Sequence, residues 1–150
     1  DADGTDLEGA YKLSKLYSML GEIPAQDVLV LMDACFSGSQ RSGETLASAR
    51  GIAIKPQIEK PKGSMVVYSA VTDKETAYPY REKVHGLFTY YLLKKIKETK
   101  GKLDLGTLSD YVTSEVSKKS IVVNKKSQHP TIQASADLAN SWRNMIIVNQ

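Results

Sequence analysis

The first 32 residues contain two apolar patterns: a helical spacing over residues 13–20 and a continuous, strand-like run over residues 28–32. An amphipathic helix is predicted by apolar side chains at positions 13, 16, 17 and 20. Ser14 is a candidate N-cap for this helix and Gly21 a candidate stop. After Pro24, Val28 to Met32 form an apolar run without alternation. A run this short predicts a strand buried on both faces of a parallel sheet.

Strand-like and helical segments alternate through the rest of the chain. Residues 64–71 predict a second buried strand. A helix from Leu87 to Thr99, closed by Gly101, is predicted by apolar side chains at positions 87, 88, 92, 93 and 96.

A capping box at Thr107 to Asp110 predicts a further helix that continues to about Lys118. Its buried stripe comprises Leu108, Tyr111, Val112 and Val116. A last strand is expected over residues 145–148. Helices that alternate with strands in this way indicate a three-layer α/β architecture.

The composition of the chain reduces the number of possible function classes but does not identify the function. A length of 150 residues fits a single domain spanning 1–150, and the 41% hydrophobic and 25% charged residues are ordinary for a globular chain. The net charge of +3 is spread along the sequence, which gives no case for nucleic-acid binding. No apolar stretch approaches the roughly 20 residues of a membrane span. The single cysteine excludes an internal disulfide and leaves the compartment undetermined, although we expect a soluble, cytoplasmic protein.

That single cysteine lies where the first predicted strand gives way to a loop. Chemistry in open α/β sheets gathers at the carboxyl ends of strands, which places Cys35 like a nucleophile. A free cysteine is more commonly a small buried hydrophobe. Asp33, however, projects from the same strand face about 7 Å away. A carboxylate so close disfavours the thiolate unless a cation intervenes, so the pair suits a site that binds a cationic substrate beside a thiol.

The motif Asp33-Ala-Cys-Phe-Ser-Gly38 at the end of an apolar strand resembles the nucleophile motif of caspase-like cysteine peptidases. The similarity is to the metacaspases and their bacterial relatives, which also resemble clostripain. Met65-Val-Val-Tyr-Ser-Ala70 and His85-Gly-Leu-Phe-Thr-Tyr-Tyr-Leu-Leu93 agree in order and rough spacing. The resemblance covers roughly Leu7 to Ala134 and implies a caspase-like three-layer sandwich with a mostly parallel sheet, closed by an extended segment at 128–133.

The resemblance also implies an activity, which is peptide cleavage after Lys or Arg. Cys35 would attack the peptide carbonyl, and its backbone N–H would help stabilise the oxyanion. Asp33 would pair with the basic side chain before the scissile bond. The segment after the second strand would form a wall of the substrate cleft, where Asp73 or Glu75 supplies a second carboxylate. The expected partner is a peptide or protein substrate.

No histidine precedes Cys35, although the partner histidine of caspases lies about 50 residues before the cysteine. The resemblance therefore implies that the catalytic histidine and the first strands of the sheet belong to an upstream segment. That segment would be a partner of this chain, and the 150 residues alone are expected to be inactive. His85 is expected to be a surface residue, and His129 is expected to be structural.

Residues 40–63 are expected to form a long loop rich in Gly, Pro, Ser and basic residues. Loops longer than about 12–15 residues are usually functional or disordered. In caspase relatives this segment is cut during self-processing, which makes Arg41, Arg50 and Lys55 candidate self-cleavage points. The alternative is a flexible surface loop open to any trypsin-like enzyme.

No cofactor and no metal site is expected. The acidic start of the chain, Asp1 to Asp6, lacks the twelve-residue calcium pattern with its closing Glu, and an Asx turn accounts for it better. Calcium dependence is left open.

Two other functions fit parts of the sequence. Cys35 to Ser42 matches the cysteine-phosphatase pattern Cys-x-x-Gly-x-x-Arg-Ser/Thr, in which backbone N–H groups and Arg41 would hold phosphate. Against this, Ala34 replaces the usual His, and Asp33 would repel a phosphate dianion. A catalytically inactive caspase-like interaction module is the other alternative.

Overall fold

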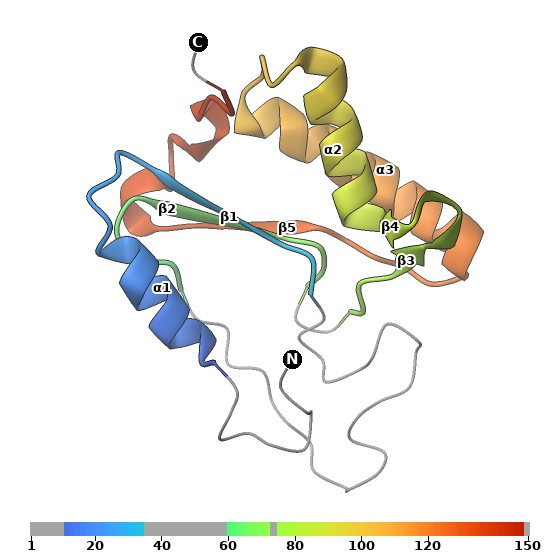
Figure 1. The fold of residues 1–150 in the computed structure, drawn as a ribbon, viewed down its shortest axis with the longest axis horizontal. Helices are drawn as coiled ribbons and strands as arrows, with labels where there is room; N and C mark the ends of the chain where they lie inside the picture. Colours follow the sequence, from blue (N-terminus) through green and yellow to red (C-terminus); the bar gives the residue numbers. More distant parts are fainter. Residues whose placement is uncertain (1–10, 35–59, 73–74, 149–150) are drawn as a thin grey trace, which may run out of the picture.

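A three-stranded sheet lies at the centre of the computed structural model (Figure 1). The structure describes residues 11–34, 60–72 and 75–148. The central strand β2 (Met65–Ser69) pairs in parallel with β1 (Val28–Met32), with Val30 opposite Val67. The other edge of β2 pairs antiparallel with β5 (Thr131–Ala134). The described sheet is therefore mixed, and its parallel pair is the one that the two apolar runs predict.

Helices cover both faces of this sheet (Figure 1). They are α1 (Leu13–Gly21), α2 (Leu87–Thr99) and α3 (Leu105–Asn124). Successive side chains of a strand point to opposite faces. Met65 and Val67 accordingly pack with Tyr17 of α1. Val66 and Tyr68 pack on the other face, beneath α2 and α3. This arrangement confirms the predicted three-layer α/β fold.

The first two helices lie where the apolar spacing predicts them. The bounds of α2 are those expected, and the chain leaves it through Lys100 and Gly101, both in the left-handed region. In α1, Lys12 holds the N-cap position and makes no side-chain capping bond. Ser14 lies inside the first turn, so the expected Ser14 cap is wrong.

Helix α3 begins earlier than the proposed capping box. The Asp104 Oδ1 atom accepts a hydrogen bond from the Thr107 backbone N–H at 2.7 Å, and Oδ2 accepts one from the Thr107 hydroxyl at 2.9 Å. Asp104 is therefore the N-cap, and Thr107 lies within the first turn. The helix also continues past the expected end at Lys118, to Asn124. The predicted stripe holds for Leu108, Val112 and Val116, which are fully buried, whereas Tyr111 is half-buried.

Two strand predictions are wrong in the part of the chain that the structure describes. β1 is not buried on both faces, since Leu31 is 42% exposed. Side chains of β1 pack on both faces of the sheet, but β1 has a strand neighbour on one edge only in the described sheet, so its side chains are less covered than those of the central strand β2. Residues 145–148 form no strand, because Ile146 makes only an isolated bridge with Asp104. The Ile147 backbone N–H donates to the Leu103 carbonyl, so this segment is tied to the loop before α3.

A short hairpin connects the region after β2 to α2. It consists of β3 (Pro79–Tyr80), the 3₁₀ helix η2 (Arg81–Lys83) and β4 (His85–Gly86). Tyr80 lies opposite His85 in the antiparallel pair. Two further 3₁₀ helices near the carboxyl end are η3 (Ala136–Leu138) and η4 (Trp142–Asn144).

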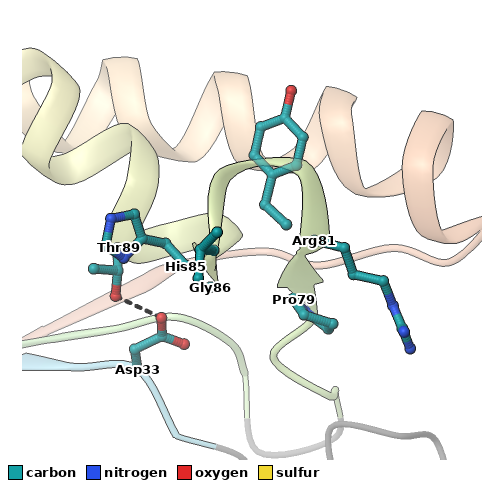
Figure 2. A pocket seen from close by; sticks show the side chains of 8 residues that line it. Asp33, Pro79, Arg81, His85, Gly86 and Thr89 are labelled. Atoms are coloured by element: carbon teal, nitrogen blue, oxygen red, sulfur yellow. Dashed lines mark hydrogen bonds between the residues drawn. The ribbon is translucent and has the colours of Figure 1, made fainter.

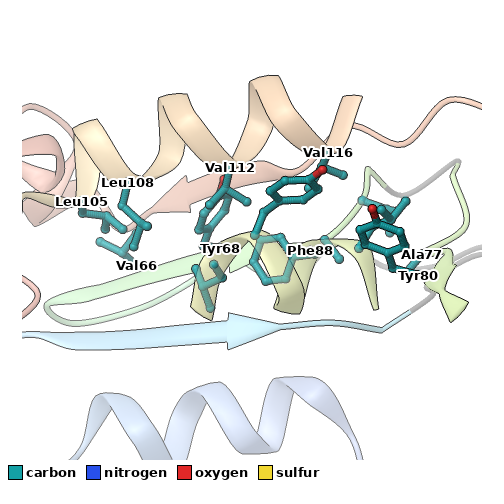
Figure 3. Packing of buried hydrophobic residues seen from close by; sticks show 14 of the residues in the cluster. Val66, Tyr68, Ala77, Tyr80, Phe88, Leu105, Leu108, Val112 and Val116 are labelled. Atoms are coloured by element: carbon teal, nitrogen blue, oxygen red, sulfur yellow. The ribbon is translucent and has the colours of Figure 1, made fainter. Parts of the chain in front are cut away.

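The larger apolar core lies between the sheet and helices α2 and α3, with Tyr68 at its centre (Figure 3). The Tyr68 ring is fully buried and meets Phe88 edge-on, with centroids 4.9 Å apart. Its hydroxyl lies 3.1 Å from the Ser109 carbonyl oxygen and 3.1 Å from the Thr113 hydroxyl. Burial raises the pKa of Tyr68 well above its ordinary value, so the phenol stays protonated. Tyr68 therefore joins β2 to α3 by both packing and a polar contact.

Replacing Tyr68 by Phe should test that polar contact. The variant keeps the ring against Phe88 but leaves the Thr113 hydroxyl and the Ser109 carbonyl without their partner. We expect the free energy of unfolding to fall by about 1–2 kcal/mol, measured by urea denaturation. Tyr11→Phe is the control, because Tyr11 is 58% exposed, and it should change stability by less than about 0.5 kcal/mol. Equal effects of the two substitutions would contradict this role.

Candidate active site

Asp33 lies directly after β1 and faces the layer formed by α2 and α3. Leu29, at the same parity of the strand, packs against the core on that side. The Thr89 hydroxyl of α2 donates a hydrogen bond of 2.6 Å to Asp33 Oδ2 (Figure 2). Thr89 belongs to the first turn of α2, where the helix dipole favours an anion by about 0.3–1 kcal/mol. The half-buried carboxylate is thus fixed at the junction of a strand end and a helix start.

Gly86 closes the space beside this carboxylate. A Cβ atom built on Gly86 would overlap Asp33 Oδ2 and crowd the rest of the carboxylate. Gly86 is fully covered and forms the end of β4 and the N-cap of α2. The position therefore requires glycine because of close approach, while its backbone, at φ −66°, is one that any residue can adopt.

Asp33 lines a cavity of about 600 Å³ between the end of β1 and the β3–β4 hairpin (Figure 2). Its lining consists of Asp33, Pro79, Tyr80, Arg81, Val84, His85, Gly86 and Thr89. Two of the lining residues, Arg81 and His85, have basic side chains and belong to the hairpin. Figure 2 shows the Arg81 side chain extending away from Asp33. The carboxylate therefore faces a space that the Arg81 guanidinium does not fill.

The structure places one of the predicted site residues at this cavity. Asp33 is among its lining residues, and its role in binding a substrate side chain stays a prediction. The remaining candidates lie outside the described residues: Cys35, Arg41, Arg50, Lys55 and Asp73. The phosphate-binding alternative, Cys35 to Ser42, lies outside them as well.

Sequence reasoning missed the two residues that hold Asp33 in place. Thr89 and Gly86 both belong to the stretch 85–93 that carries part of the family resemblance, but nothing in the sequence alone relates them to Asp33. His85 is exposed, as expected, yet it also lines the cavity.

Glu75 is directed to His129 and does not line the Asp33 cavity, so the alternative placing of Glu75 in the pocket is wrong. Glu75 Oε1 lies 2.6 Å from His129 Nδ1, and Oε2 accepts a hydrogen bond of 2.9 Å from the His129 backbone N–H. Partial burial acts to raise the pKa of Glu75. The side-chain and backbone hydrogen bonds from His129 outweigh it, and the net pKa is lowered. The pair joins the segment after β2 to the residue two positions before β5.

Val84 occupies a strained position on the rim of the cavity. Its φ of 58° lies in the left-handed region, which is unusual for a β-branched residue. The side chain is 88% exposed, so no apolar packing compensates for this conformation. Strained residues of this kind cluster at ligand-binding and active sites.

The described residues include no cluster of His, Cys, Asp and Glu that could hold a metal ion. Among the same residues, no helix is both long and apolar enough to span a bilayer. Among the described residues, the lining of this cavity includes a fixed carboxylate, that of Asp33, at the carboxyl end of a strand.

A comparison with family models agrees with this geometry. The model of the caspase domain matches residues 4–139, which is most of the chain. The chain belongs to the caspase family of cysteine peptidases. Searches among curated proteins and among solved structures gave no match.

Substituting Val84 by Asn should stabilise the protein. Asn adopts the left-handed region at lower cost than a β-branched residue, so we expect the free energy of unfolding to rise by about 1 kcal/mol. Urea denaturation measures the change. Val122→Asn is the matched control, because Val122 is also exposed but lies within the regular helix α3. A gain in Val122→Asn as large as that in Val84→Asn would show that backbone strain is not the cause.

The Glu75–His129 pair should make stability depend on acid pH. Because the folded-state pKa of Glu75 lies below its ordinary value of 4.5, the stabilisation is present above that value. It is lost as the pH falls through the lowered pKa. Glu75→Gln should therefore be less stable than wild type at pH 7, by up to about 1 kcal/mol for a pair whose His129 side chain is exposed.

The difference between wild type and Glu75→Gln should shrink as the pH is lowered from about 5 to 3, in urea denaturation at each pH. Glu82→Gln, which removes an exposed carboxylate from η2, is the control. A difference that stays constant over this range would mean that the carboxylate charge of Glu75 is not involved.

Proposed function

We propose that this chain carries the nucleophile of a metacaspase-type cysteine endopeptidase that cleaves after Lys or Arg. Membership of the caspase family supports the reaction class. The observation that carries the specificity is the position of Asp33, whose carboxylate is fixed by Thr89 and faces a cavity at the end of β1. Cys35 follows two residues later in the sequence. The basic side chain of a bound peptide would enter this cavity and pair with Asp33.

Covalent catalysis by Cys35 is the reaction that we propose. The Cys35 thiolate would attack the carbonyl carbon of the scissile bond, and the Cys35 backbone N–H would stabilise the resulting oxyanion. As the C–N bond breaks, a histidine supplied from outside this chain would protonate the departing amine, leaving a thioester on Cys35. Water would then hydrolyse the thioester, release the new carboxyl group and restore the thiol.

The electrostatics of the cavity favour a basic rather than an acidic substrate side chain. Caspases proper use Arg to select Asp, and Arg81 is the cationic side chain in this lining that could do so. Arg81 extends away from Asp33 (Figure 2), whereas the Asp33 carboxylate is held toward the cavity by a charge-assisted hydrogen bond. A guest carboxylate would meet the like charge of Asp33, and a guanidinium or ammonium would meet its opposite.

Asp33→Asn should remove the preference for basic peptides. This variant keeps the shape of the side chain and a carbonyl acceptor for Thr89 but has no charge. We expect kcat/KM on Lys and Arg peptides to fall about 10- to 100-fold, the range for losing a charged hydrogen bond of about 1.5–3 kcal/mol. Fluorogenic peptides with Arg, Lys or Asp before the scissile bond, assayed with the full-length protein, measure this effect.

Arg81→Gln is the matched control in the lining of the same cavity. It removes a positive charge, the same sign as that of a basic substrate side chain. Cleavage of basic peptides should therefore stay unchanged or increase. Cys35→Ala gives the blank. Loss of activity in Arg81→Gln, together with preference for Asp peptides, would reverse the assigned specificity. Absence of any cleavage by the wild type would favour an inactive interaction module. Turnover of phosphotyrosine analogues alone, blocked by vanadate, would favour the phosphatase.

A further inference from the structure

Gln128 is a fully buried amide in the segment before β5. Its Oε1 atom accepts a hydrogen bond of 2.9 Å from the Tyr78 backbone N–H. Its Nε2 atom donates one of 3.1 Å to the Ala70 carbonyl oxygen. Its backbone N–H donates to the Ser120 hydroxyl, also at 3.1 Å. The side chain thus uses both ends of its amide, and the main chain fixes it to α3.

These bonds hold the two ends of one loop together. Ala70 comes directly after β2, and Tyr78 comes directly before β3. The single amide of Gln128 bridges both, so it sets where the chain enters the hairpin that walls the Asp33 cavity. Since β3 contributes Pro79 and Tyr80 to that wall, the bridge fixes the wall relative to the sheet.

The same network reaches the carboxylate itself. The Tyr78 carbonyl accepts a hydrogen bond of 3.0 Å from the backbone N–H of Leu87, the first residue of α2. Thr89 lies two residues further in that helix and holds Asp33. The two sides of the cavity, β3 and the start of α2, are therefore both linked to Gln128 through Tyr78.

We propose that Gln128 is a positioning residue for substrate binding, which sets the distance between the hairpin wall and the Asp33 carboxylate. This inference rests on the proposed peptidase function. Gln128 is not among the lining residues of the cavity, so it acts through Tyr78. Loss of the hydrogen bonds of its side-chain amide weakens substrate binding in the cavity and leaves the reaction at Cys35 unchanged.

Gln128→Met and Gln128→Glu test this role in the full-length protein. Met keeps the length of the side chain but cannot make either hydrogen bond of the Gln128 side-chain amide. Glu keeps an acceptor for Tyr78 but has no donor for Ala70 when ionised. With an Arg peptide, we expect KM to rise about tenfold in Gln128→Met while kcat stays within about twofold. Alkylation of Cys35 by iodoacetamide should proceed at the wild-type rate.

A matched control and an independent readout accompany these variants. Gln133→Met changes a half-buried glutamine of β5 five positions away and should leave KM unchanged. Hydrogen exchange of the wild type and Gln128→Met should show faster exchange at the Tyr78 and Leu87 amides in the variant. Ser120→Ala is the milder substitute if Gln128→Met does not fold. It keeps both hydrogen bonds of the Gln128 side chain and removes the anchor of the Gln128 backbone N–H, together with a hydrogen bond within α3 to the Ser117 carbonyl. Its KM should rise in the same direction.

The outcomes separate the two proposals. A raised KM with unchanged kcat and unchanged alkylation supports the positioning role. Reduced thermal stability with unchanged KM, or equal effects of Gln128→Met and Gln133→Met, overturns it while leaving the peptidase function standing. Absence of cleavage by the wild type overturns the peptidase function and the positioning role with it.

Discussion

The described structure depends on the central strand β2, which is buried on both faces and paired at both edges. Four successive side chains of this strand, Met65 to Tyr68, are buried, two toward each helical layer. The parallel partner β1 and the antiparallel partner β5 are both registered against it. Because the carboxyl ends of β1 and β2 lie at one edge of the sheet, the same pairing that forms the core brings Asp33 and the loop after Ala70 to one side of the molecule.

The candidate site then depends on how a single negative charge is held. The first turn of α2 provides a hydroxyl donor and a favourable dipole to Asp33, and Gly86 lets the carboxylate lie close against the backbone. None of these contacts supplies a full positive charge. The carboxylate is oriented by the Thr89 hydroxyl and by its close packing against Gly86.

Local patterns in the sequence were sufficient for elements whose periodicity is strong. Helix α2 has the predicted bounds because its apolar positions follow the helical repeat and Gly101 ends it. The apolar runs gave β1 and β2, and their parallel pairing is confirmed. The predicted start of α3 was wrong because Thr107 and Asp104 are both residue types found at N-caps, and Asp104 is the one whose backbone has the N-cap geometry. Such a choice depends on φ and ψ, which composition does not reveal.

The site was predictable only in part, for a similar reason. Asp33 could be found because side chains alternate along a strand of known direction. Its contact with Thr89 spans 56 positions, and the bridge from Gln128 to Ala70 spans 58, so no local pattern reports them. Residues 145–148 carry the composition of a strand but are tied to the loop before α3, which shows tertiary contacts overriding β-propensity.

The close approach of Gly86 to Asp33 also restricts how this cavity can diverge in evolution. A larger residue at position 86 would overlap the carboxylate where it now lies, so the Asp33 side chain would have to move or be replaced by a smaller one. Replacing Asp33 by a small neutral residue removes this overlap, whereas enlarging position 86 first requires the carboxylate to leave its present place. The selectivity of the cavity is therefore expected to change along an ordered path, in which the charge is lost before the wall is rebuilt.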